Sequence, residues 1–295
     1  MRGGGSVTRK KKRLIVFAVI IVAVAAVWLF LQHIYPHFHV PFVPSDPPAD
    51  LTALLSKPAL QEEDYRLLFA QTGLGKPAID DLLALGDEGK TQILDTQTTF
   101  LNHPGEAPCT PLGITTREHR YLDAEGYALP MVPLAPLKNG DILVTLSTHT
   151  AGWSHGHAGL VVDAERGVTL ESVVLGSLSS QMNVNHWRSY STLAVLRPQA
   201  DEETRQKVVQ LALDKLDNIP YSLVSGAFGE KFQPLDSAHS AHCGYLPWYA
   251  WMSTGIDLDS DGGRIAAPED FLHSPNVEVV QVFGFDPTDF ADGGH

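Results

Sequence analysis

The stretch NGDILVTLSTHTAGWSHGHAGLVVDAERGVTLESVV, residues 139–174, holds three short apolar runs separated by residues that favour turns. The runs DILVTLS, HAGLVVD and VTLESVV are rich in aliphatic and β-branched residues, which is typical of strands. The AERG sequence between the last two runs predicts a hairpin. Two later runs, STLAVLR and VEVVQVFGF, repeat the pattern and predict two more strands.

Helical patterns flank these strands on both sides. Before them come LQEEDYRLLFAQTGLG, KPAIDDLLALG and GKTQILDTQTTFL, and after them comes the amphipathic DEETRQKVVQLALDKLDN. Residues 103–137 are rich in Pro and Gly, and we expect them to be irregular. Clustered strands with helices around them predict an α+β fold with a mostly antiparallel sheet.

The N-terminus predicts a membrane anchor. Five consecutive basic residues, Arg9 to Arg13, precede Leu14–Leu31, which is eighteen apolar residues long and uncharged. As a helix this run measures about 27 Å, against a hydrocarbon core of roughly 30 Å. The basic cluster predicts that the N-terminus lies in the cytoplasm and the remainder outside it. The alternative is a signal peptide cleaved near Ala23–Ala25, which would release a secreted domain.

The charge of the remaining chain argues against some partners. Six of the 21 basic residues lie in residues 1–13, which leaves 15 to balance 34 acidic residues. A net charge near −19 on the external part disfavours nucleic acid and anionic lipid as partners. The expected divisions are a basic tail (1–13), a transmembrane anchor (14–31), a Pro-rich linker (32–50), a helical lead-in (51–110), the main domain (111–287) and a tail (288–295).

Cys243 is the candidate nucleophile. It stands in SAHCGYLPWYAW, where small and polar residues give way to a helical pattern. The N–H groups and dipole at a helix start favour a thiolate. The alternatives are a buried structural cysteine and a disulfide with Cys109, the other cysteine of the chain.

His157 is the candidate base. It opens the run HAGLVVD, and the hairpin can place Glu171 across from it, where a carboxylate would orient the imidazole. His149 and His155 are expected to be loop residues that shape a cleft. A metal site is the alternative for His155 with His157, with Cys243, His242 or Glu171 as third ligand, because the spacing selects none of them.

These motifs resemble a known family. Residues 218–251, which contain NIPYSLVSGAF and HCGYLPWYAW, resemble the cysteine segment of NlpC-type peptidases. Residues 139–163 resemble that family's Gly-Asp strand and the histidine strand that follows it. Because the histidine segment comes first here, the chain resembles the circularly permuted papain-like branch, similar to the YycO and YiiX groups, over roughly residues 60–285.

The resemblance implies a cysteine hydrolase of papain-like fold that needs no cofactor. Cys243 would be the nucleophile, His157 the base and Glu171 the third polar residue, while Tyr221 would line the site and support the oxyanion. The family pattern is Cys-Ser-x-Leu-Val-Trp, and this chain departs from it at two positions. Gly244 stands in place of the serine and Pro247 in place of the valine. With the membrane anchor, the expected substrates are peptides of the cell wall.

Two other functions stay open at this point. Related permuted enzymes of the lecithin:retinol acyltransferase type act on acyl lipids, and a tethered domain would lie near lipid. A non-catalytic wall-binding module is the third possibility. The sequence does not determine the oligomeric state.

The acidic segment GIDLDSDGG raises the possibility of a structural calcium ion. Asp257, Asp259 and Asp261 match the first half of a calcium loop, but Pro268 replaces the glutamate expected at position twelve. The alternative is an acidic surface turn without an ion.

Overall fold

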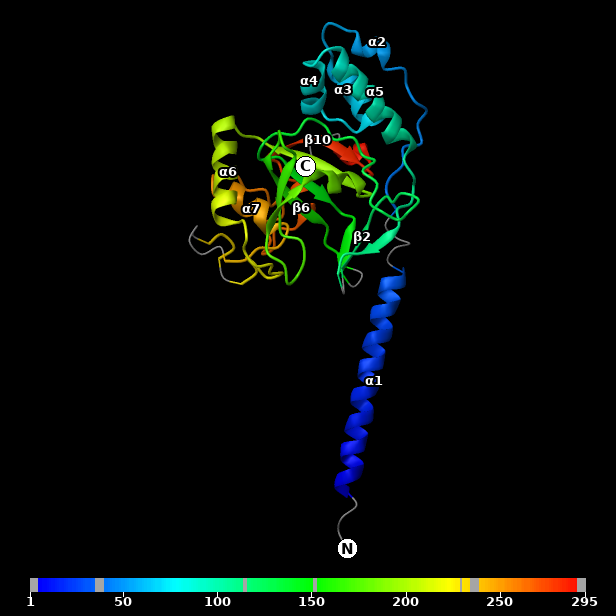
Figure 1. The fold of residues 1–295 in the computed structure, drawn as a ribbon, viewed down its shortest axis with the longest axis vertical. Helices are drawn as coiled ribbons and strands as arrows, with labels where there is room; N and C mark the ends of the chain where they lie inside the picture. The colour runs from blue at the N-terminus through cyan, green and yellow to red at the C-terminus, as the bar shows by residue number, and fades with distance from the viewer. Residues whose placement is uncertain are drawn as a thin grey trace.

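A six-stranded antiparallel sheet forms the centre of the molecule (Figure 1). The computed structural model describes residues 5–34, 40–113, 116–150, 153–228, 230–233 and 239–290. The strand order is β10-β9-β3-β6-β7-β8. The strands are β3 (Ile142–Thr145), β6 (His157–Asp163), β7 (Val168–Glu171), β8 (Ser180–Asn183), β9 (Leu193–Pro198) and β10 (Val277–Phe283). The prediction of an α+β fold with an antiparallel sheet is confirmed.

Helices cover both faces of this sheet. One core contains side chains of α6 (Glu202–Lys215), α7 (Tyr245–Met252) and α8 (Pro268–Leu272). The opposite core contains side chains of α2 (Thr52–Leu55), α3 (Glu62–Thr72), α4 (Lys76–Leu83) and α5 (Asp87–Asn102). Ile142 and Val144 face the first core and Leu143 faces the second, because successive side chains of a strand alternate. Burial on both faces explains why the strands are apolar throughout.

The helical lead-in is joined to the sheet by a close backbone approach at β10. A Cβ atom on Gly73 would lie 2.1 Å from the Val282 carbonyl oxygen, and one on Gly75 would lie 1.9 Å from that of Val279. Gly73 also has a φ of +68°, which favours glycine. The two glycines therefore let α3 and α4 pack directly against the edge of the sheet.

A second, four-stranded sheet has the order β1-β2-β4-β5. Its strands are β1 (Cys109–Pro111), β2 (Thr116–His119), β4 (Thr148–Thr150) and β5 (Trp153–Ser154). The prediction that residues 103–137 are irregular is wrong for β1 and β2, since strands this short carry no readable periodicity. The expected boundary between residues 110 and 111 falls inside β1. The domain also contains two 3-10 helices, η2 (Val184–Ser189) and η4 (Pro287–Phe290).

Asp141, in the Gly-Asp motif before β3, has a structural role. Its carboxylate is fully buried and accepts hydrogen bonds from Arg197 Nε at 3.0 Å and Nη2 at 2.9 Å. It also accepts the Lys138 N–H at 2.7 Å. These contacts fix the entry of β3 against β9.

The N-terminal helix α1 (Gly5–Ile34) projects from the domain as a separate rod (Figure 1). An 18-residue window within Arg9–Phe30 has a mean hydropathy of 2.8, and this segment is long and apolar enough to cross a membrane. A signal sequence has the same properties. The linker reaches the domain at Phe42, whose N–H donates to the Gly284 carbonyl at 2.9 Å. Residues 35–39 of the linker and 291–295 of the tail lie outside the described residues.

Candidate active site

The β6–β7 hairpin brings His157 and Glu171 together. Glu171 pairs directly with Gly159, so it lies diagonally across from His157 on the same face of the sheet. The His157 Nε2 and Glu171 Oε2 atoms are 2.7 Å apart. A Cβ on Gly159 would lie 3.1 Å from Glu171 Cγ and 2.9 Å from Trp187 Cζ2. Glycine at 159 therefore leaves the space that this contact needs.

Glu171 is fully buried and surrounded by hydrogen-bond donors. Its carboxylate contacts His157 Nε2, His186 Nε2 at 3.2 Å, Trp187 Nε1 at 2.8 Å and Thr169 Oγ1 at 2.5 Å. Burial opposes ionisation, but the bonds from His157 and His186 outweigh it and hold the pKa of Glu171 far below its usual range. The group is therefore a carboxylate that orients the imidazole. Trp187 stacks on the His157 ring, with centroids 5.2 Å apart.

Cys243 meets His157 where β6 begins. Both side chains are buried, and Cys243 Sγ lies 4.0 Å from the Gly156 carbonyl oxygen. Because Glu171 occupies Nε2 of His157, Nδ1 is the atom left to interact with the thiol. Burial opposes the thiolate, yet His157 and His242 hold the pKa of Cys243 well below its usual value. Burial likewise opposes the imidazolium, but Cys243 and Glu171 raise the pKa of His157 to about 10.

The start of α7 shows the surroundings of Gly244 and Pro247, the two residues that depart from the pattern of the family that the chain resembles. α7 begins at Tyr245, two residues after Cys243. A Cβ on Gly244 would lie 2.1 Å from the Ala266 carbonyl oxygen, so the serine of the family would not fit here. Pro247 lies in the first turn, between Leu246 and Trp248, whose N–H groups donate to the His242 and Gly244 carbonyls. Because proline has no N–H, position 247 donates no such bond to the Cys243 carbonyl. Cys243 lies directly before this helix start.

Tyr221 also lies at this site. An isolated parallel bridge pairs Tyr221 with Ala241, two residues before Cys243. Burial and the charge of Cys243 raise the pKa of the Tyr221 phenol above its usual range. The hydroxyl is therefore neutral at neutral pH and is available as a hydrogen-bond donor.

Three site residues were not assigned these roles from the sequence: His186, Trp187 and His242. His186 and Trp187 come from η2, outside both motifs that carry the family resemblance. His242 accepts the Tyr245 N–H at Nδ1, at 3.1 Å, and so holds the start of α7 beside the thiol. The only feature of the sequence that pointed to His242 as part of this site was its position next to Cys243.

The other two histidines of the opening stretch, His149 and His155, make different contacts. His155 contacts Thr150 Oγ1 at 2.9 Å and the Gly156 carbonyl at 2.7 Å, and the described residues offer no metal cluster that joins it to His157. His149 is fully buried in β4, so the prediction that it is a loop residue is wrong. Its strand is too short to be recognised from periodicity. Cys109 and Cys243 are both free thiols, so the structure contains no disulfide between them.

The acidic loop differs from the expected calcium set. Asp259 and Asp261 gather with Asp270, whereas Asp257 accepts the Trp248 Nε1–H at 2.8 Å. The Lys231 ammonium pairs with Asp259 and donates to the Gly263 carbonyl at 2.9 Å. A calcium ion here stays a prediction, and it would have to compete with the Lys231 ammonium.

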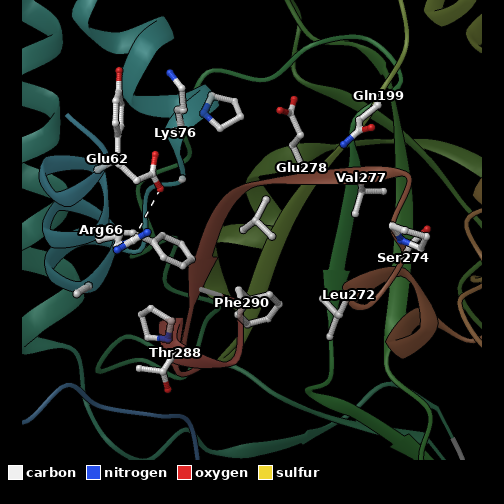
Figure 2. Close-up of a pocket in the computed structure, with 18 residues that line it drawn as sticks. Glu62, Arg66, Lys76, Gln199, Leu272, Ser274, Val277, Glu278, Thr288 and Phe290 are labelled. Atoms are coloured by element: carbon white, nitrogen blue, oxygen red, sulfur yellow. Dashed lines mark ion pairs between the residues drawn. The ribbon is translucent and has the colours of Figure 1, made fainter. Parts of the chain in front are cut away.

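A pocket of about 570 Å³ lies between α3, β10 and η4 (Figure 2). Phe69, Val279 and Phe290 supply apolar walls, and Glu62 and Arg66 form an ion pair at its edge. It shares no lining residue with the Cys243 site, so it is not the substrate cleft of that site.

Cys243, His157 and Glu171 thus form a continuous buried chain from a thiol to a carboxylate. Such a chain can hold a thiolate beside an imidazolium and pass a proton between the sulfur and a reacting group. Comparisons of this chain with protein-family models, curated proteins and solved structures found no match.

Proposed function

We propose that this chain is a membrane-anchored cysteine hydrolase that cleaves amide bonds through an acyl-enzyme. The observation that carries the proposal is the buried cluster in which the Cys243 thiol interacts with His157, while Nε2 of His157 binds the Glu171 carboxylate. Cell-wall peptides are the proposed substrates, in keeping with the resemblance to NlpC-type peptidases. The apolar α1 after a basic tail would place the catalytic domain outside the cytoplasm.

The proposed reaction has two stages. The Cys243 thiolate attacks the carbonyl carbon, and the tetrahedral oxyanion accepts a hydrogen bond from the Tyr221 hydroxyl. The carbon–nitrogen bond then breaks as the His157 Nδ1–H protonates the leaving amine, which gives a thioester. His157 next takes a proton from water, the hydroxide attacks the thioester, and the acid leaves with Cys243 regenerated. Glu171 stabilises the imidazolium at each proton transfer.

The test is the pH dependence of iodoacetamide labelling, measured on the full chain in detergent with EDTA present. The lowered pKa means that Cys243 is already a thiolate at neutral pH, so its rate should change less than about twofold between pH 6.5 and 8.5. Burial raises the pKa of Cys109, so the same step should change its rate about 100-fold. Peptide mapping by mass spectrometry separates the two sites.

The control variant is His157→Gln, which removes the imidazolium. Labelling of Cys243 in this variant should follow an ordinary thiol and become strongly pH-dependent. A wild-type Cys243 that labels only above pH 8.5, or one unaffected by His157→Gln, would contradict the proposed thiolate.

One observation favours a second candidate, an acyl-lipid hydrolase of the same chemistry. Large apolar side chains are exposed on the two segments that border the site, among them Leu175 at 70% and Phe228 at 79% exposure. Bridges from Leu178 to Pro220 and from Tyr221 to Ala241 connect these segments to the Cys243 loop. The segment around residues 220–233, yellow in Figure 1, lies on the side from which α1 projects. An apolar rim facing a membrane suits lipid substrates.

The two candidates predict opposite responses to Leu175→Ser with Phe228→Ser. If lipids are the substrate, the double variant should lose about tenfold or more in kcat/KM on phosphatidylcholine vesicles, because two apolar contacts are removed. If peptides are the substrate, turnover of a purified stem peptide should change less than twofold and vesicles should not be hydrolysed. Leu85→Ser is the matched control, since Leu85 is 52% exposed at the end of α4, away from the site.

A further inference from the structure

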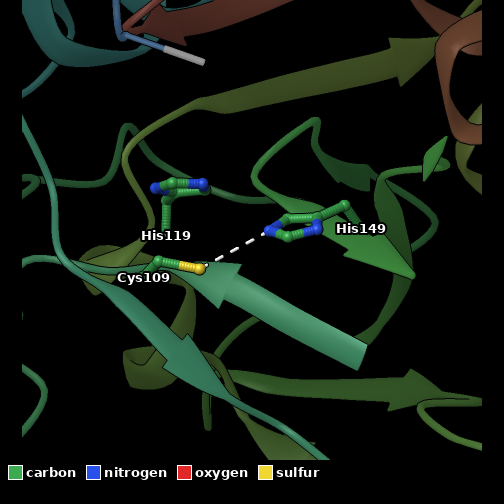
Figure 3. Close-up of side chains that lie close together, drawn as sticks. All are labelled: Cys109, His119 and His149. Atoms are coloured by element: carbon green, nitrogen blue, oxygen red, sulfur yellow. Dashed lines mark hydrogen bonds between the residues drawn. The ribbon is translucent and has the colours of Figure 1, made fainter. Parts of the chain in front are cut away.

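A second cysteine–histidine cluster lies in the small sheet, apart from the residues of the Cys243 site. It consists of Cys109 on β1, His119 on β2 and His149 on β4 (Figure 3). Cys109 pairs directly with His119, and His149 pairs with Arg117, so all three side chains lie on one face of adjacent strands. Their ligand atoms lie within 4.8 Å of one another.

The distances match a tetrahedral zinc site. Zinc bonds of about 2.3 Å to sulfur and about 2.05 Å to nitrogen, at a tetrahedral angle, place the two ligand atoms about 3.6 Å apart. Cys109 Sγ and His149 Nε2 are 3.5 Å apart. An ion between them would therefore need little movement of either strand.

The imidazole ring of His119 is already oriented as in a metal-binding histidine. Its Nδ1 lies 3.1 Å from the Ala107 carbonyl oxygen, so Nδ1 donates the proton and Nε2 carries a lone pair. The Nε2 atom is buried and has no hydrogen-bond partner among the described residues. Metal-binding histidines commonly donate their second nitrogen to a backbone carbonyl in this way. A buried lone pair left without a donor is costly, and a metal ion would satisfy it.

One positive charge, on Arg117, acts on the Cys109 thiol of the cluster. Burial raises the pKa of Cys109, while the neighbouring Arg117 acts in the opposite direction. A metal ion would displace the thiol proton, and the thiolate would face both the ion and the Arg117 guanidinium.

We propose that Cys109, His119 and His149 bind one zinc ion, with a fourth position open to water. The ion would join β1 to β4 across a sequence separation of 40 residues. Strands of three and four residues are marginal by themselves, so a shared ion would stabilise this sheet. The site shares no residue with the Cys243 site and is independent of the chemistry proposed there.

The experiment uses the full chain in detergent, stripped with a chelator and titrated with zinc chloride against a chromogenic chelator. We expect one zinc ion per chain and a higher melting temperature with zinc. Cys109→Ser and His119→Asn should each weaken zinc binding by more than about 100-fold. Cobalt in place of zinc should show a thiolate-to-metal charge-transfer band that disappears in Cys109→Ser.

Cys243→Ala is the matched control, since it removes the other thiol and should leave zinc binding and the cobalt band unchanged. Circular dichroism of each variant separates lost binding from lost folding, and His119→Asn keeps the test valid if Cys109→Ser does not fold. Zinc binding that survives in Cys109→Ser, or that is lost in Cys243→Ala, would overturn the site. These measurements do not use activity, so they stand whether or not the proposed hydrolase is found.

Discussion

Replacing Cys243 by alanine is expected to lower kcat/KM by at least about 10³-fold, because no other group at the site can form the thioester. His157, Glu171 and Tyr221 would remain in place and could still bind substrate. The Michaelis constant should therefore change far less than kcat. The measurement is turnover of a stem peptide and of phosphatidylcholine by the full chain in detergent.

The intermediate gives a second measurement of the same change. A small activated ester such as p-nitrophenyl acetate should acylate Cys243, and mass spectrometry after an acid quench should find the acyl group on that peptide. Cys109→Ala is the matched control, because it removes the other free thiol of the chain and should leave acylation unchanged. Full activity in Cys243→Ala, or acylation confined to Cys109, would rule out the proposed nucleophile.

Glu171→Gln is expected to lower kcat by about 10²- to 10⁴-fold while the protein stays folded. The glutamine oxygen would accept the Trp187 and Thr169 donors at the Oε1 position, which places its NH₂ toward His157. That NH₂ would donate to Nε2 of His157 and leave the proton on Nδ1. His157 could then no longer take a proton from Cys243.

The pH profile separates this tautomer effect from a general loss of structure. Without the carboxylate the imidazolium is less stable, so labelling of Cys243 should shift to higher pH in Glu171→Gln. Thr169→Val is the matched control, since it removes one donor to Glu171 but keeps the charge, and it should cost less than about tenfold. Equal losses in the two variants would show that Glu171 acts only through packing.

Much of the fold was predictable because its signals are local. The runs around β3, β6, β7, β9 and β10 are apolar and bounded by turn residues, and α3 to α6 have regular apolar spacing. The small sheet was missed because its strands have two to four residues, too few to show a period. The edge strand β8, SQMN, is mostly exposed and polar, so it gave no strand signal either.

The interaction between His157 and Cys243 joins residues 86 positions apart. Their sequence motifs identified both residues as candidates but did not predict their relative positions. The Glu171 contact followed from the hairpin, because pairing in a short hairpin is set by its turn. His186 and Trp187 were missed because η2 reaches Glu171 only through packing across the sheet.

The sequence by itself determined the class of fold, the apolar N-terminal helix and the identity of Cys243, His157 and Glu171 as candidates, since these depend on local composition and short motifs. Only the tertiary structure decided which nitrogen of His157 binds Glu171, and that Lys231 contacts Asp259. It also decided that Cys109, His119 and His149 meet. The physical reason is that such contacts depend on strand register and on packing between distant segments, where a shift of one residue turns a side chain to the other face.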